Sequence, residues 1–120
     1  MKAFRPPTKK RITTICLPSR MLHDLDQAVL SEHKSIRFRS RWVCNAIESF
    51  FNLERYKQLI TDEWIDRGNN ENIILTLDPA SIDKIEAVAK EMIEEKGQKD
   101  VQSGVIRAAI TQKLIDMELL

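Results

Sequence analysis

The chain contains two short β-branched runs, and each comes directly before a pair of amphipathic helical stretches. The first run covers residues 11–17 and ends at Pro18, which has no amide hydrogen to donate to a sheet. The second run covers residues 72–77 and ends at Asp78-Pro79, a pair typical of a helix start. An isolated strand leaves its backbone hydrogen-bonding groups without partners. We therefore predict that the two runs pair with each other as an antiparallel ribbon, supported by the helices that follow them.

The helical stretches keep the same order in both copies. Apolar residues recur every three or four positions from Ser19 to near His33, and a second stripe follows Ser40, the predicted N-cap. Ser103 has the position of Ser40 in the second copy, and Gly97 is the expected stop of the preceding helix. This duplication predicts a mainly α fold with one two-stranded antiparallel β-ribbon, arranged in tandem as βαα-linker-βαα. The predicted segments are a basic flexible arm at 1–10, a first repeat at 11–52, a helical linker at 53–71 and a second repeat at 72–120.

Alternation along the two runs gives the predicted ribbon two different faces. One face is mostly apolar and is expected to be buried: Thr13, Ile15, Leu17, Ile73, Leu75 and Leu77. The opposite face has no further segment of chain to cover it, and it carries Ile12, Thr14, Cys16, Asn72, Ile74 and Thr76. A ribbon that is exposed on one side and flanked by a basic arm fits the major groove of DNA.

Positive charge is concentrated in the first half of the chain, although the net charge of the whole is only +1. Residues 1–57 hold twelve Lys and Arg and five Asp and Glu, whereas residues 58–120 hold seven and thirteen. Such asymmetry indicates a polyanion partner for the basic half. The acidic half is a candidate surface for a protein partner.

Other classes of function lack the residues that they need. No apolar run reaches the roughly 18 residues of a membrane span, and residues 1–10 have no apolar stretch of a secretory signal, so we expect a cytoplasmic protein without membrane association. Cys16 and Cys44 stand alone, and His23 and His33 have no second ligand at metal-binding spacing. We therefore expect no disulfide, metal site or cofactor. No phosphate-binding glycine loop or nucleophile and base arrangement is present, so we expect no enzyme activity.

The spacing of these segments resembles the ribbon-helix-helix family of DNA-binding proteins, which includes the Arc and MetJ repressors. The resemblance rests on ITTICLPSRMLHDL at 12–25 and FRSRWVCNAI at 38–47, repeated as ILTLDP at 74–79 and VQSGVIRAAI at 101–110. Members of the family form the ribbon by dimerisation. This chain is similar to a tandem version and, in organisation, to the TraY-type accessory proteins of conjugative DNA processing.

The resemblance implies two sets of DNA contacts. Base edges would be read by the outward ribbon residues Ile12, Thr14, Cys16, Asn72, Ile74 and Thr76. The phosphate contacts implied at the start of the second helix of each copy fall on Arg39, Ser40 and Arg41 and on Gln102 and Ser103. The basic residues Lys9, Lys10 and Arg11 would add charge beside the ribbon. The outward face differs from the family pattern because it carries two Ile and a Cys where Arg, Lys, Gln or Asn are common.

These observations predict a double-stranded DNA-binding protein, chiefly a transcriptional regulator such as a repressor from a bacterial, archaeal or mobile-element genome. One chain would form one ribbon as a monomer, with further self-association on repeated DNA sites. A relaxosome or partition accessory protein of a mobile genetic element is an alternative that binds DNA in the same way. A protein-binding antitoxin or adaptor is the alternative that the apolar outward face favours. Trp64, in the linker, either packs inward or binds a partner.

Overall fold

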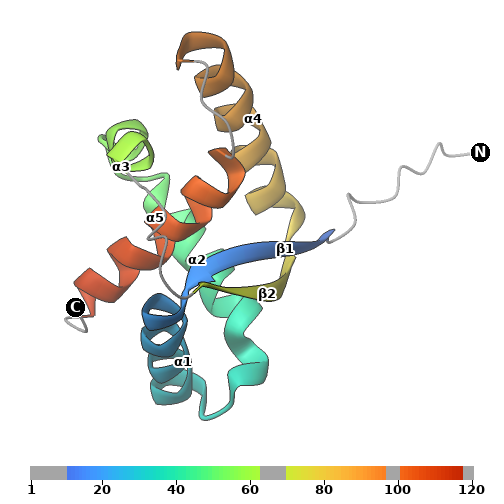
Figure 1. Cartoon of the computed structure of the whole chain (residues 1–120), viewed down its shortest axis with the longest axis vertical. Helices are drawn as coiled ribbons and strands as arrows, with labels where there is room; N and C mark the ends of the chain where they lie inside the picture. Colours follow the sequence, from blue (N-terminus) through green and yellow to red (C-terminus); the bar gives the residue numbers. More distant parts are fainter. Residues whose placement is uncertain (1–10, 63–69, 97–100, 118–120) are drawn as a thin grey trace, which may run out of the picture.

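The protein is described here by a computed structural model that covers residues 11–62, 70–96 and 101–117. Within these ranges, a two-stranded antiparallel ribbon lies on one side of a layer of helices (Figure 1). The elements in chain order are β1 (Arg11–Pro18), α1 (Ser19–His33), the short 3₁₀ helix η1 (Ile36–Phe38), α2 (Arg39–Phe50), α3 (Tyr56–Asp62), β2 (Asn70–Leu77), α4 (Pro79–Lys96) and α5 (Val101–Asp116).

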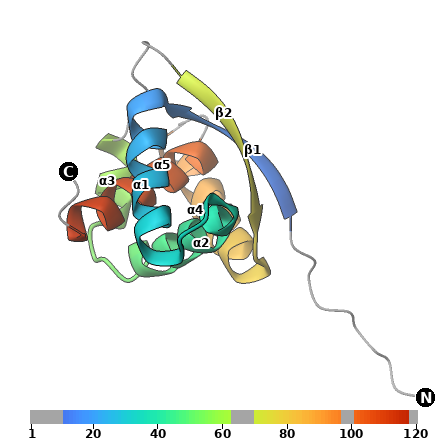
Figure 2. The same ribbon diagram turned by 90° about the horizontal axis from the view of Figure 1, so that it is seen from below.

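The predicted tandem arrangement is wrong, although a mostly helical chain with a two-stranded antiparallel sheet is correct. In the described ranges, five α-helices lie on one side of a single ribbon (Figure 2), and this does not fit two βαα repeats joined by a linker. The two strands pair with each other as predicted. The error lies in the helices, which do not form two separate pairs joined by a linker. The segment expected to be a linker also belongs to the core, because Ile60 of α3 is buried in it.

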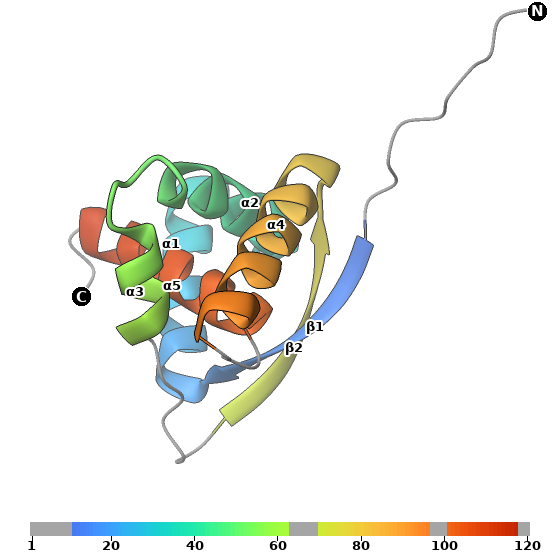
Figure 3. The ribbon, with the colours of Figure 1, turned by 90° about the horizontal axis from the view of Figure 1, so that it is seen from above.

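The ribbon has the register that its alternation predicts. Ile12 lies opposite Thr76, Thr14 opposite Ile74, and Cys16 opposite Asn72. The intervening residues Ile15, Leu17, Ile73, Leu75 and Leu77 are buried against the helices. In two further views the ribbon runs along the outside of the helical layer, and no described helix covers its outer face (Figures 2 and 3).

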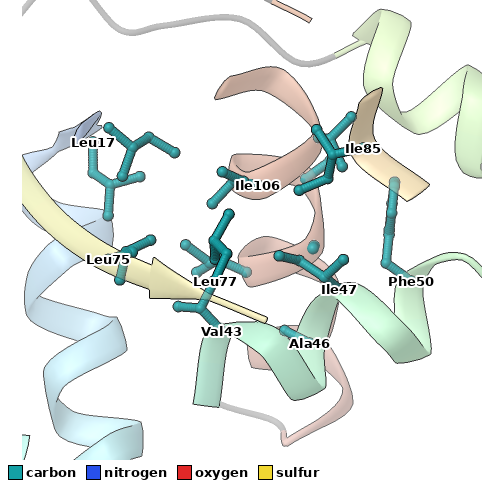
Figure 4. Packing of buried hydrophobic residues seen from close by; sticks show 14 of the residues in the cluster. Leu17, Val43, Ala46, Ile47, Phe50, Leu75, Leu77, Ile85 and Ile106 are labelled. Carbon is teal, nitrogen blue, oxygen red and sulfur yellow. The ribbon is translucent and has the colours of Figure 1, made fainter. Parts of the chain in front are cut away.

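Helices α2 and α5 pack against each other behind the ribbon and provide the centre of the core. Apolar side chains of the two strands point toward Val43 and Ile47 of α2 and toward Ile106 of α5 (Figure 4). Trp42 and Phe50 are at most 1% exposed, so α2 buries a large aromatic residue near each end. The ribbon is therefore fixed to a packed helical base, which leaves its other face available for a ligand.

Local chemistry explains where α1 and α4 begin and end. Asp78 caps α4, because its Oδ1 accepts a hydrogen bond from the Ser81 amide at 2.8 Å, as the sequence predicts. Helix α1 ends where Lys34 adopts a left-handed conformation with φ of 61°, a common way to terminate a helix. Gly97, the predicted stop of α4, lies outside the described residues.

Candidate nucleic-acid interface

The outer face of the ribbon is a regular array of exposed side chains. The structure places all six predicted base-facing residues there. Ile12 and Ile74 are 71% and 66% exposed, and Thr14, Asn72 and Thr76 are exposed as well, while Cys16 is half-buried. These two large apolar side chains are exposed to solvent and do not contribute to the core. Exposed apolar side chains on one face often mark a surface that binds a partner. This face is therefore the first candidate for a binding surface.

A hollow of about 660 Å³ lies beside the β2 end of this face. It is bounded by η1, the first turns of α2 and the end of β2, and it is lined by Arg37, Phe38, Ser40, Arg41, Cys44, Asn45, Thr76 and Asp78. The side chains of Arg37 and Arg41 are exposed. We call this hollow the β2-side groove. It joins a basic surface to the outward ribbon residue Thr76.

Ser40 connects the β2-side groove to the ribbon, and it is not the N-cap that the sequence predicts. Helix α2 begins at Arg39 with Phe38 as its N-cap residue, and no side chain caps it. The η1 turn leads directly into α2, so the chain is already helical before Ser40. The Ser40 hydroxyl instead accepts a hydrogen bond from the Thr76 amide at 2.9 Å. Ser103 is likewise inside α5, which begins at Val101.

Arg39, a predicted phosphate contact, is engaged within the protein. Its Nε and terminal nitrogen donate to the two carboxylate oxygens of Asp26, each at 2.9 Å. Both side chains are about three-quarters buried, with 22% and 26% exposure. This two-point contact fixes the start of α2 to α1. Of the three arginines at this turn, Arg37 and Arg41 are therefore the ones directed to solvent.

Replacing Asp26 with Asn tests this structural role for Arg39. We expect D26N to lower the free energy of unfolding by about 1 kcal/mol, because a partly buried two-point charge contact becomes a weaker neutral one. Urea denaturation at neutral pH measures the change. D24N on the same helix is the control, since Asp24 has no ion pair among the described residues. Equal stability losses in the two variants would contradict the assignment.

A smaller hollow of about 100 Å³ lies along the β1 edge of the ribbon. We call it the β1-side groove, and it is lined by Thr13, Thr14, Ile15, Leu77, Ile82, Ile85, Glu86, Gln102, Ser103 and Ile106. Gln102 is exposed and Ser103 is half-buried. These two predicted phosphate contacts thus share a groove with the carboxylate of Glu86. The described residues that line it include no Lys or Arg.

The other predicted basic contacts cannot be placed. Lys9 and Lys10 lie outside the described residues, as does Trp64 of the expected linker. Arg11 is described only as the first backbone position of β1.

Arg107 is a structural residue that the sequence analysis did not single out. It is only 4% exposed, and a terminal guanidinium nitrogen lies 3.4 Å from the carbonyl oxygen of Cys16. Cys44 of α2 makes a similar contact with the other strand, because its sulfur lies 3.9 Å from the carbonyl oxygen of Thr76. Nothing in the local sequence indicates the role of Arg107, since its contact joins residues 91 positions apart. Both residues tie a helix to the strand that it supports.

Burial raises the pKa of the Cys44 thiol, and the nearby Asp78 carboxylate adds to that rise, against a smaller lowering by hydrogen bonds. The raised pKa keeps this thiol protonated at neutral pH. The folded protein therefore favours the protonated thiol of Cys44. The stability that this preference contributes is fully present below the pKa that Cys44 has in the unfolded chain. It is lost as the pH rises through the higher pKa of the folded protein.

We expect alkylation of Cys44 by iodoacetamide at pH 7.5 to be about tenfold or more slower than that of an unfolded-chain cysteine, since only the thiolate reacts. Mass spectrometry of peptides over a pH series measures the rate at each cysteine. The C44S variant assigns the slow site. Labelling of Cys44 at the rate found in urea would contradict the prediction.

Among the described helices, none combines the length and the apolar character that crossing a membrane requires. The described part of the chain also contains no cluster of three or more His, Cys, Asp or Glu side chains suited to a metal ion. Comparison of the chain with protein-family models, with curated proteins and with solved structures finds no match.

Proposed function

We propose that the protein binds double-stranded DNA by placing the outer face of the β1–β2 ribbon in the major groove. One observation carries the proposal. The outer face of the ribbon is uncovered, its side chains are regularly spaced, and it lies beside a groove with two exposed arginines. A two-stranded ribbon has the right width for the major groove, which is about 12 Å wide. This is also the binding mode that a resemblance to ribbon-helix-helix proteins implies.

The outward side chains have suitable chemistry for base edges. Asn72 can form two hydrogen bonds with adenine, and Thr14 and Thr76 can donate to or accept from several bases. Ile12 and Ile74 can contact the methyl group of thymine. Because the two strands present different residues, the preferred DNA sequence is expected to be asymmetric even though the backbone of the ribbon is nearly two-fold symmetric.

Sequence-independent affinity would come from the β2-side groove. Arg37 and Arg41 are exposed there, next to the ribbon edge. Positive side chains at the rim of a groove binder displace counterions from DNA phosphates, so binding weakens as salt concentration rises. Arg39 contributes indirectly by fixing the turn that carries the other two arginines.

The biological role that fits this mode is a cytoplasmic transcriptional regulator that acts by occupying its DNA site. A relaxosome or partition accessory protein would bind in the same way and recruit a further protein. Neighbouring genes distinguish the two roles, since a relaxase gene beside this one favours the second.

Selection from random-sequence DNA at two salt concentrations tests the proposal. We expect enrichment of an asymmetric motif, with affinity that falls steeply between about 50 and 200 mM salt. Binding without any enriched motif would contradict the proposal that the ribbon reads base edges. A failure of the protein to bind DNA at low salt would contradict the proposed function itself.

The exposure of Ile12 and Ile74 also favours a second candidate function, the docking of a protein by an antitoxin or adaptor. The outer face would then be covered by an apolar surface of the partner. A stable complex with a protein, together with no retention of DNA at low salt, would support this candidate.

A further inference from the structure

Methyl groups dominate the outer face of the ribbon. None of its six outward residues is Lys, Arg, Asp or Glu, and the two isoleucines and two threonines all carry methyl groups. The isoleucines are the most exposed large apolar side chains among the described residues. The six residues form three successive rows of two across the ribbon: Ile12 with Thr76, Thr14 with Ile74, and Cys16 with Asn72.

On the premise that the proposed DNA binding holds, we infer that the ribbon recognises A·T-rich DNA chiefly through the C5-methyl groups of its thymines. In the major groove thymine presents this methyl group, and cytosine has no methyl group there. An apolar side chain gains free energy when it and a methyl group are removed from water together. Ile12 and Ile74 therefore favour thymine without forming a hydrogen bond.

Guanine is the base that the outer face is least suited to read. The commonest specific contact with guanine is a two-point hydrogen bond from Arg or Lys to its O6 and N7 atoms. The six outward residues offer no such donor, and the exposed Arg37 and Arg41 lie in the β2-side groove beside the ribbon. Asn72 matches adenine, because a side-chain amide can accept from N6 and donate to N7. The outer face thus offers contacts for both bases of an A·T pair.

The register sets the order of these contacts along the DNA. Neighbouring rows on one face of a strand are about 6.6 Å apart, because residues i and i+2 share a face. This distance is close to two base-pair steps of about 3.4 Å each. Ile12, Ile74 and Asn72 lie in three successive rows. Two methyl contacts and one adenine contact should therefore follow each other in this order, at intervals of about two base pairs.

Recognition by methyl contact extends to methylated cytosine. The methyl group of 5-methylcytosine occupies the ring position that carries the methyl group of thymine. An isoleucine that contacts this position should therefore favour 5-methylcytosine over cytosine. DNA binding should respond to cytosine methylation at the two positions that Ile12 and Ile74 contact, and at no other position.

Uracil substitution in the selected motif tests the inference. Uracil pairs as thymine does and lacks only the methyl group, so the charges and hydrogen-bonding groups of the DNA stay the same. At the two thymines that contact isoleucine, uracil should weaken binding by about three- to fivefold, the value of one buried methyl group. If cytosine replaces either thymine, 5-methylation of that cytosine should strengthen binding by about the same factor. Gel-shift titrations at constant low salt measure each change.

Two protein variants assign each methyl contact to a side chain. In I74A, uracil should no longer weaken binding at one of the two thymines, while the loss at the other thymine remains. I12A should give the converse result. I115A is the matched control, because Ile115 is a 47% exposed isoleucine on the last turn of α5 and not on the ribbon. This variant should keep the uracil sensitivity of the wild-type protein at both thymines.

The DNA substitutions leave the protein unchanged, so their outcome does not depend on whether a variant folds. Equal affinity for thymine and uracil at every position of an enriched motif would overturn the inference. A uracil effect that persists at both thymines in I12A and in I74A would also overturn it, as would a motif dominated by G·C pairs. These results leave DNA binding by the ribbon intact. An absence of binding to any DNA at low salt would overturn the proposed function and the inference that rests on it.

Discussion

The double variant R37A/R41A should lose about 10- to 100-fold in DNA affinity at low salt and should do so on every DNA sequence. Both side chains are exposed in the β2-side groove, where they would neutralise backbone phosphates. Removing two phosphate contacts should also lower the slope of log affinity against log salt by about two. Gel-shift titrations at several salt concentrations, on the selected motif and on unrelated DNA, measure both effects.

A variant with the same change of charge elsewhere provides the control. Arg55 and Lys90 are exposed on the turn before α3 and on α4, so R55A/K90A should keep both the affinity and the salt slope within about twofold. An unchanged salt slope in R37A/R41A would contradict the assignment of the β2-side groove. Equal losses in the two double variants would instead indicate a diffuse effect of net charge.

Hydrophobic periodicity predicts most of the secondary structure, because burial on one face leaves a direct mark on sequence. The alternation of Ile73, Leu75 and Leu77 specifies the buried face of β2, and the stripe containing Leu25 and Val29 specifies α1. The beginning of β2 could not be placed in this way. Asn70 has the local chemistry of a turn, but it lies in the strand because it is paired with Pro18 of β1.

Two contacts at the candidate site join residues that are distant in sequence, and sequence reasoning found neither of them. Serine is a residue typical of helix N-caps, but the Ser40 hydroxyl accepts a hydrogen bond from the amide of Thr76, which lies 36 residues later in the chain, in β2. Arg39 is indistinguishable from Arg41 by sequence, but only Arg39 faces Asp26 across the α1–α2 turn. Local sequence carries no information about either contact, since both depend on how separate elements pack. The predicted tandem arrangement was wrong for a related reason. The sequence pattern does not show that Ile60 of α3, in the expected linker, packs into the core shared by the other helices.

The outward residues of the ribbon, in contrast, followed from alternation alone. Once Ile15 and Leu17 are buried, strand geometry directs Ile12, Thr14 and Cys16 to the other face. The sequence therefore predicts which residues form the outer face of the ribbon. It does not distinguish the arginines beside that face that are exposed from the one that is held inside the protein.

The double variant I12E/I74E should abolish specific DNA binding, with a loss of at least about 100-fold. The two isoleucines are 71% and 66% exposed on the outer face, Ile74 near its middle and Ile12 toward one end, so in the proposed complex the glutamates would face the floor of the major groove. Bringing two carboxylates into that negative environment costs several kcal/mol, and each 1.4 kcal/mol is about a tenfold change in affinity. Because neither isoleucine belongs to the core, the free energy of unfolding should change by no more than about 0.5 kcal/mol for each substitution.

The neutral variant I12Q/I74Q separates charge repulsion from loss of apolar contact. If the isoleucines touch thymine methyl groups, this variant should keep its phosphate-dependent affinity, and its selected motif should change at the contacted positions. Gel shifts measure the affinity, random-site selection gives the motif, and urea denaturation checks the fold. Wild-type affinity of I12E/I74E for its motif would show that the outer face does not enter DNA. Retained DNA binding combined with loss of a protein complex would favour the docking function for the same face.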